Sequence, residues 1–164
     1  MKYTIFAIVS TILVIISWLL SPILAGISMA LDTPKLPWGL QWFSTVDDDL
    51  DGGQHQNHYP TGATGWSLWW QRTRWICRNP AQGFQTFLLG YSATNYYLVN
   101  DEELIGGSRY REWKDVNGHT IFADQRQVRL AGKYYLKQWF GWALKPSINR
   151  FTFKFVPISI EVRK

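Results

Sequence analysis

The sequence predicts an α+β protein. We expect an N-terminal transmembrane helix, one short Trp/Arg-rich helix, and then an antiparallel five- to six-stranded β meander that forms a curled sheet or partial barrel. Residues 3–31 contain no charged residue and no histidine. Residues 66–77 place tryptophans at helical spacing, and later segments alternate apolar and polar residues between turn residues.

Composition limits the chain to an apolar segment and one compact domain. The 164 residues carry a net charge of +5 and a single cysteine, so no intrachain disulfide can form. Lys2 is the only charged residue before Asp32, so the excess positive charge lies downstream. Because no Lys/Arg run of the nucleic-acid-binding kind occurs, we expect lipid headgroups rather than nucleic acid as the anionic partner.

Residues 1–32 are the expected membrane segment, since about 20 apolar residues cross a bilayer. Pro22 is expected to bend or interrupt the helix near Ser21. We favour an uncleaved anchor in a bacterial inner membrane, with a cytoplasmic N-terminus and a periplasmic C-terminal domain. The alternative is a cleaved signal peptide, for which Ser28-Met29-Ala30 offers small residues, although the apolar stretch is long for that role.

Residues 33–64 form an aromatic neck and an acidic loop. Two prolines and a glycine stop the first helix from continuing into the neck. We expect Trp38, Trp42 and Phe43 to lie at the depth of the lipid headgroups, on a short amphipathic turn. Packing of these three rings onto the domain is the alternative.

The acidic loop opens like a calcium-binding loop, with alternating aspartates followed by Gly52. Its twelfth position is His58, where such a loop has glutamate. The alternatives are a transition-metal site that uses the histidines and a solvated loop whose aspartates cap turns. No cofactor is therefore firmly expected, and Ca²⁺ is the first candidate. The candidate metal ligands are Asp47, Asp49, Asp51, His55 and His58.

Residues 65–79 predict a helix that ends at Asn79, before Pro80. One stripe of this helix holds Trp66, Trp69, Trp70, Thr73, Ile76 and Cys77. Either the stripe is the main core contact, with the arginines solvated or paired to the acidic loop, or the helix lies at the membrane with its arginines toward phosphates. The candidate residues for partner or lipid binding are Trp66, Trp69, Trp70, Arg72, Arg74 and Arg78.

Three motifs in the first half of the chain carry a resemblance. They are L-P-W-x-L-x-W-F at Leu36–Phe43, an acidic L-D-G motif within Asp48–Gly52, and R-x-R-W-x-x-R-N-P-A-x-G-F at Arg72–Phe84. This order resembles an uncharacterised family of small membrane-associated proteins of tailed phages and prophages. The resemblance implies a phage-encoded, membrane-associated protein and supplies no catalytic residues.

The C-terminal half predicts β structure, which we group with the Trp/Arg helix as a domain of residues 65–164. Asn117-Gly118 favours a hairpin with a type I′ turn. A bulge at Pro157 would bring Phe151, Phe153 and Phe155 onto the same face as the later apolar residues. The expected strands are Phe84–Tyr91, Asn95–Asn100, Arg109–Asp115, His119–Leu130, Tyr134–Lys145 and Arg150–Arg163.

No catalytic motif is present, and we expect a non-enzymatic membrane protein. It would bind an envelope or phage component, in superinfection exclusion, lysis control or virion–membrane attachment. One alternative is an envelope hydrolase or metal-binding enzyme that uses the Asp47–His58 loop. The other is a nucleic-acid binder that stacks bases on the Trp/Arg helix, which requires a cytoplasmic location.

Overall fold

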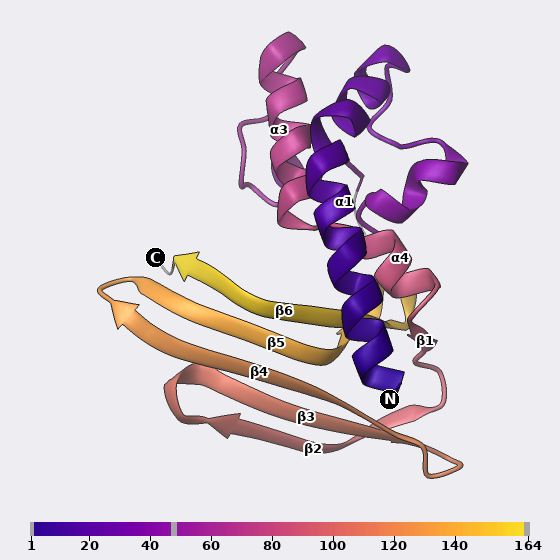
Figure 1. Cartoon of the computed structure of the whole chain (residues 1–164), viewed down its shortest axis with the longest axis vertical. Helices are drawn as coiled ribbons and strands as arrows, with labels where there is room; N and C mark the ends of the chain where they lie inside the picture. The colour runs from indigo at the N-terminus through magenta and orange to yellow at the C-terminus, as the bar shows by residue number, and fades with distance from the viewer. Residues whose placement is uncertain (1, 47–48, 163–164) are drawn as a thin grey trace. The chain divides into compact units, whose positions relative to one another are not determined.

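A computed structural model of the chain describes residues 2–46 and 49–162, which form two compact units divided between Leu89 and Gly90. The first unit is helical and the second is a sheet (Figure 1). The Trp/Arg helix, which the sequence grouped with the sheet, belongs to the first unit. The helices of this unit are α1 (Lys2–Ala30), η1 (Trp38–Phe43), α2 (Gly52–His55), α3 (Gly65–Arg78) and α4 (Gln82–Phe87).

Helix α1 continues through Pro22, so the interruption that the sequence allowed near Ser21 does not occur. Proline lacks the N–H that would bond the carbonyl of Trp18. The hydroxyl of Ser21 donates to that carbonyl oxygen at 2.8 Å, so the group remains satisfied. Within the described residues, one stretch, Tyr3–Ala30, is long and apolar enough to cross a membrane.

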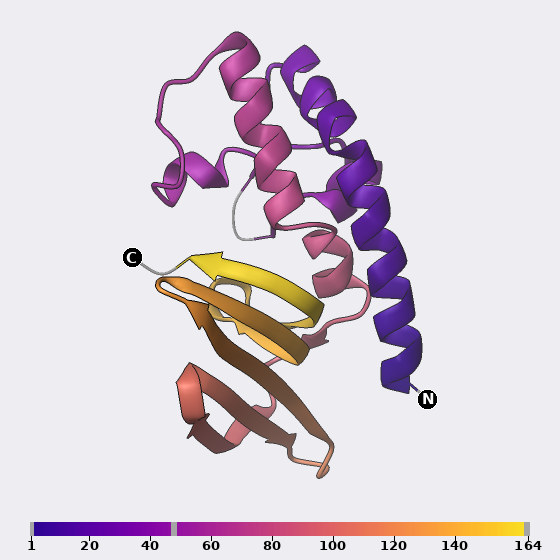
Figure 2. The same cartoon turned by 60° about the vertical axis from the view of Figure 1, so that its left-hand side comes forward.

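Helices α1 and α3 lie side by side in both views (Figures 1 and 2). Helix α3 begins and ends as the sequence predicts, with Asn79 as its C-cap. A small apolar core joins the C-terminal half of α1 to the neck, the acidic loop and α3. Its buried members are Leu24, Leu36, Leu50 and Ile76, with Leu20, Leu40 and Phe43 packed against them.

The predicted strand Phe84–Tyr91 is wrong: its first half belongs to helix α4, and the only strand there is β1 (Tyr91–Ser92). The alternating pattern there does not mark a half-exposed strand, because five consecutive residues, from Gln82 to Thr86, are buried. Gly83 lies so close to the neck that a Cβ added to it would sit 2.3 Å from the backbone oxygen of Gln41.

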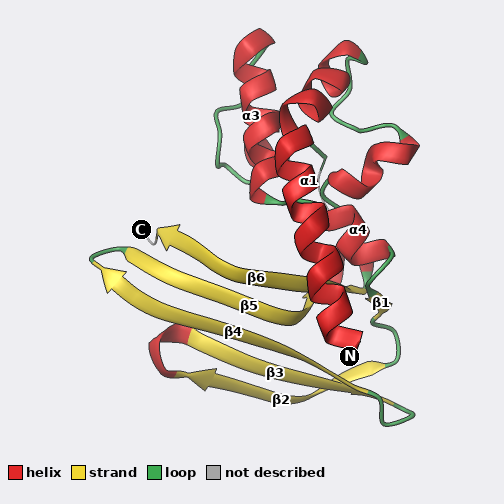
Figure 3. Cartoon of the chain, viewed as in Figure 1, coloured by secondary structure: helices red, strands yellow, loops and turns green. Residues whose placement is uncertain are grey.

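The second unit is one antiparallel sheet with strand order β1-β6-β5-β4-β3-β2 (Figure 3). Its sequential hairpins confirm the predicted meander, and the sheet is not closed. The longer strands are β2 (Tyr96–Leu104), β3 (Ser108–Asp115), β4 (Thr120–Ala131), β5 (Tyr134–Lys145) and β6 (Arg150–Val162). The short 3₁₀ turns η2 (Ile105–Gly107) and η3 (Pro146–Ile148) connect two of the hairpins.

Aromatic contacts between strands that are not neighbours show that the sheet is curled. The ring of Phe151 on β6 lies 5.1 Å from that of Trp113 on β3 and 5.4 Å from that of Tyr96 on β2. Trp142 and Phe153 are also buried, with ring centroids 5.2 Å apart. This aromatic core confirms the predicted curl.

Two local predictions in the sheet have different outcomes. Lys137 pairs with Ser159 and Trp139 with Val156, so one residue of β5 faces two of β6, and the bulge at Pro157 is confirmed. Asn117-Gly118 does connect β3 to β4, but only Gly118 has a positive φ, so the turn is not type I′. The Asp115 carboxylate instead accepts the N–H groups of Asn117 and His119 at 2.9 and 2.7 Å.

Candidate functional site

The described part of the acidic loop is fixed by hydrogen bonds. The side chain of Asp49 accepts the backbone N–H of Asp51 at 2.9 Å, which is the turn-capping role that aspartate often takes. The N–H of Leu50 donates to the carbonyl of Pro34 at 2.9 Å, and its side chain is buried. The loop is therefore tied to the neck, with Asp51 directed toward α3.

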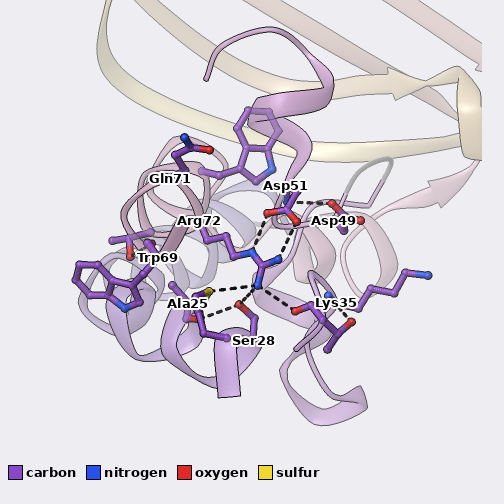
Figure 4. A network of polar contacts seen from close by, with 12 residues as sticks. Ala25, Ser28, Lys35, Asp49, Asp51, Trp69, Gln71 and Arg72 are labelled. Carbon is purple, nitrogen blue, oxygen red and sulfur yellow. Dashed lines mark hydrogen bonds and ion pairs between the residues drawn. The ribbon is translucent and has the colours of Figure 1, made fainter. Parts of the chain in front are cut away.

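A buried ion pair joins Asp51 to Arg72 of α3 (Figure 4). The Nε and Nη2 groups of Arg72 donate to the two carboxylate oxygens of Asp51, both at 2.8 Å. Arg72 is only 5% exposed. Bidentate pairs of this kind are the strongest side-chain hydrogen bonds, and a buried guanidinium requires such partners.

The same guanidinium holds the C-terminal end of α1. Its Nη1 donates to the hydroxyl of Ser28 at 3.1 Å and to the carbonyl of Thr33 at 3.3 Å (Figure 4). A positive charge beside the C-terminus of a helix interacts favourably with the helix dipole. Arg72 thus links α3, the acidic loop and α1. This contact matches the predicted alternative in which an arginine of the helix pairs with the acidic loop, and it removes Arg72 from the predicted surface for partner or lipid binding.

The predicted metal ligands do not converge in the described part of the chain. Asp47 lies outside the described residues. Asp51 is held by Arg72, His55 lies 3.9 Å from Asp49, and His58 lies beside Trp75 with ring centroids 6.1 Å apart. Among residues 2–46 and 49–162, no three His, Cys, Asp or Glu side chains form a metal-binding group.

Four buried serines on one face of α1 form a ladder of polar contacts with α3 and α4, called the serine ladder below. Their spacing of seven, four and seven residues places them on one side of the helix. Ser10 to Ser28 covers about 27 Å at 1.5 Å per residue. The contacts are Ser28 Oγ with Arg72 Nη1 (3.1 Å), Ser21 Oγ with Cys77 Sγ (3.1 Å), Ser17 Oγ with the N–H of Ala81 (3.3 Å), and Ser10 Oγ with Gln85 Nε2 (2.8 Å).

The hydroxyl of Ser21 donates its proton to the carbonyl of Trp18, so in the contact between Ser21 and Cys77 the thiol is the donor. Two indoles strengthen the same helix pair. Trp18 Nε1 donates to the carbonyl of Cys77 at 3.1 Å, and Trp69 Nε1 donates to the carbonyl of Pro22 at 2.9 Å. Helix α1 therefore contacts α3 through polar groups along much of its length.

The opposite face of α1 is apolar and exposed. Its large side chains recur at intervals of three or four residues, as expected for one face of a helix. This polarity is the reverse of a helix packed on a soluble protein, where the apolar face is buried. The exposed members, called the isoleucine face below, are Ile5, Ile8, Ile12, Ile15, Leu19 and Ile23.

The predicted tryptophan stripe on α3 is only partly a core contact. Trp66 is 77% exposed and stacks on Trp69, with ring centroids 4.4 Å apart, and Trp70 is also exposed. The buried face centres instead on Arg72, Trp75 and Ile76. Arg74 and Arg78 are exposed, and the guanidinium of Arg74 lies 4.9 Å from the ring centre of Tyr59.

The neck presents exposed aromatic rings beside two open clefts. Trp38 is 88% exposed, and Trp42 packs edge-on against Phe84 at 5.4 Å, whereas Phe43 joins the small core. One cleft of about 510 Å³ is lined by residues that include Lys35, Asp49 and His55, and one of about 380 Å³ by Trp38, Gly39, Gln41, Trp42 and Phe87.

Sequence reasoning overlooked the serine ladder, although its spacing is visible in the printed sequence. The sequence analysis assigned no contact to Ser10 or Ser17, and it placed Gln85 on a strand. Two features of the sequence indicate the ladder: the serines recur at helical spacing, and polar residues follow one another at Gln82, Gln85 and Thr86.

Comparison with known proteins gives one match. A family model described as "Family of unknown function (DUF7338)" matches residues 1–163. No curated protein and no solved structure shows significant similarity to the chain.

Proposed function

The chain belongs to the family of unknown function DUF7338, and we propose that it is a non-enzymatic protein held in a bacterial inner membrane by α1. The observation that carries the proposal is the reversed polarity of α1, with serines buried and isoleucines exposed. Small residues and serine hydrogen bonds are typical of helix interfaces in lipid. An exposed apolar face of this length is typical of contact with acyl chains.

The energetic gain is sufficient to hold the protein in the bilayer. Full burial of one large apolar side chain contributes about 1.5–3 kcal/mol. The six members of the isoleucine face are each roughly half exposed, so their transfer into lipid contributes on the order of 5–9 kcal/mol. Trp38 and Trp42 of the neck are suited to the headgroup region at the end of the helix.

We propose as the partner another envelope protein or a phage component, in superinfection exclusion, lysis control or virion attachment. This part rests on the resemblance to phage and prophage proteins and on the exposed Trp66, Trp70, Arg74 and Arg78. Aromatic and arginine side chains are the residues most enriched in protein interfaces. Arg72, which is buried in its ion pair, is excluded from this surface.

Membrane fractionation tests the anchor. The full chain, expressed in a bacterial host, should remain in the membrane pellet after washing with alkaline carbonate. Replacing Ile8, Ile12 and Ile15 together by Asp should release it, and replacing the same three by Val should not. Recovery of the unaltered chain in the carbonate supernatant would rule the anchor out.

Phage plating tests the partner. Cells that express the chain should plate tailed phages less efficiently than cells without it. The pair Trp66→Ala and Trp70→Ala should restore plating while the protein stays in the membrane pellet. If the double variant protects cells as well as the unaltered chain, these two rings do not form the partner surface.

A further inference from the structure

The serine ladder fixes the direction in which the chain returns along α1. Ser28, near the C-terminal end of α1, contacts Arg72, and Ser10, near its N-terminal end, contacts Gln85. Residues 72–85 therefore run antiparallel to α1 over the about 27 Å between these two serines. Leu89, which ends the first unit, follows Gln85 by four residues.

From this path we propose that the N-terminus and the C-terminal sheet lie on the same side of the membrane, in the cytoplasm. The inference rests on the proposed membrane location of α1. It applies whether α1 crosses the bilayer together with its return segment or lies along the surface with the isoleucine face in lipid. In both arrangements the chain leaves the helical unit at the end where α1 began.

With the N-terminus in the cytoplasm, a sheet in the periplasm, as the sequence first indicated, requires the ladder to break. Helix α1 would have to cross without α4, which would separate Ser10 from Gln85 and Ser17 from the N–H of Ala81. Buried polar groups that lose their partners destabilise the fold, and in lipid no water replaces them.

The distribution of positive charge agrees with the proposed topology. The loop segment 31–64, between α1 and α3, contains one Lys and no Arg, together with five Asp. The positive-inside rule counts Lys and Arg in short loops such as this one, whereas a long domain such as 90–164 is translocated largely regardless of its charge. A short loop with a single Lys is suited to face away from the cytoplasm.

Reporter fusions to the C-terminus of the full chain test the proposal. Alkaline phosphatase is active only after export, and green fluorescent protein fluoresces only in the cytoplasm. We expect an inactive phosphatase fusion and a fluorescent one, both in the carbonate-washed membrane pellet. A second readout uses Lys133→Cys, in the exposed turn between β4 and β5, with Cys77→Ser to remove the native thiol.

A membrane-impermeant maleimide should label Lys133→Cys only after the cells are permeabilised, and the permeabilised sample shows that the thiol is reactive. An active phosphatase fusion together with labelling in intact cells would overturn the inference and leave the membrane anchor standing. A chain found in the soluble fraction would instead overturn the proposed function, and the inference with it.

Discussion

The ion pair between Arg72 and Asp51 should be the most sensitive point of the helical unit. We consider Arg72→Met in the full chain in detergent micelles, because Met fills much of the same volume without the charge. The change removes the two bonds to Asp51 and those to the hydroxyl of Ser28 and the carbonyl of Thr33. It leaves the Asp51 carboxylate without its cation.

Removing one partner of a buried ion pair typically costs about 3–5 kcal/mol. The side chain of Asp51 is 19% exposed, so water reaches part of the carboxylate, and we take the lower limit of about 3 kcal/mol. For a unit of this size, 1 kcal/mol shifts the melting temperature by about 4–8 °C. The expected loss is therefore about 12–24 °C.

Thermal unfolding followed by tryptophan fluorescence measures this loss. Arg74→Met is the matched control on the same helix, because Arg74 is exposed and contacts only the ring face of Tyr59 among the contacts described for it. That contact contributes below about 1 kcal/mol. If Arg72→Met lowers the melting temperature no more than Arg74→Met does, the ion pair does not hold the unit together. A double-mutant cycle with Asp51→Asn should give a coupling of at least about 2 kcal/mol.

Three further predictions follow from single contacts. Ser17→Leu should destabilise the helical unit by about 1–3 kcal/mol, because no space exists for a larger side chain at a fully buried position, and chemical unfolding in detergent measures the change. Gly83→Ala should lower the melting temperature because its Cβ would lie 2.3 Å from a backbone oxygen of the neck, whereas Gly39→Ala, with open space around it, should not. Hydrogen bonds from Arg109 lower the pKa of Asp101, so this pair should stabilise the sheet above about pH 4 and lose that contribution as the pH falls through the lowered pKa. Melting temperatures measured across this pH range should show the loss, and the Asp101→Asn variant should not show it.

Local patterns were enough to predict much of the fold. Helix α3 begins and ends where the caps and Pro80 indicated, and five of the six expected strands are present. These elements depend on periodicity, turn residues and proline, all of which act over a few neighbours. The bulge at Pro157 was predictable for the same reason, since the phase of the apolar residues changes there.

Contacts between distant residues explain the errors. Gln85 was assigned to a strand because its buried amide bonds to Ser10 of α1, 75 residues earlier in the chain, which no local pattern reveals. For Arg72 the sequence left open an exposed position or a pairing with the acidic loop, because its partner, Asp51, lies 21 positions earlier in the chain. From hydrophobicity alone, tryptophan is expected to be buried more often than arginine. On α3, Arg72 is buried and Trp66 is exposed, and the ion pair with Asp51 is what permits the burial of Arg72.

The face of α1 that meets lipid decides most directly whether α1 is a membrane anchor. Spin labels placed singly at Ile8, Ile12, Ile15 and Leu19 of the full chain in lipid nanodiscs test this, on a Cys77→Ser background. We predict that all four labels relax readily with oxygen and poorly with a water-soluble nickel complex, as groups in acyl chains do. Labels that collide with the nickel complex at all four positions would place the isoleucine face in water and contradict the account.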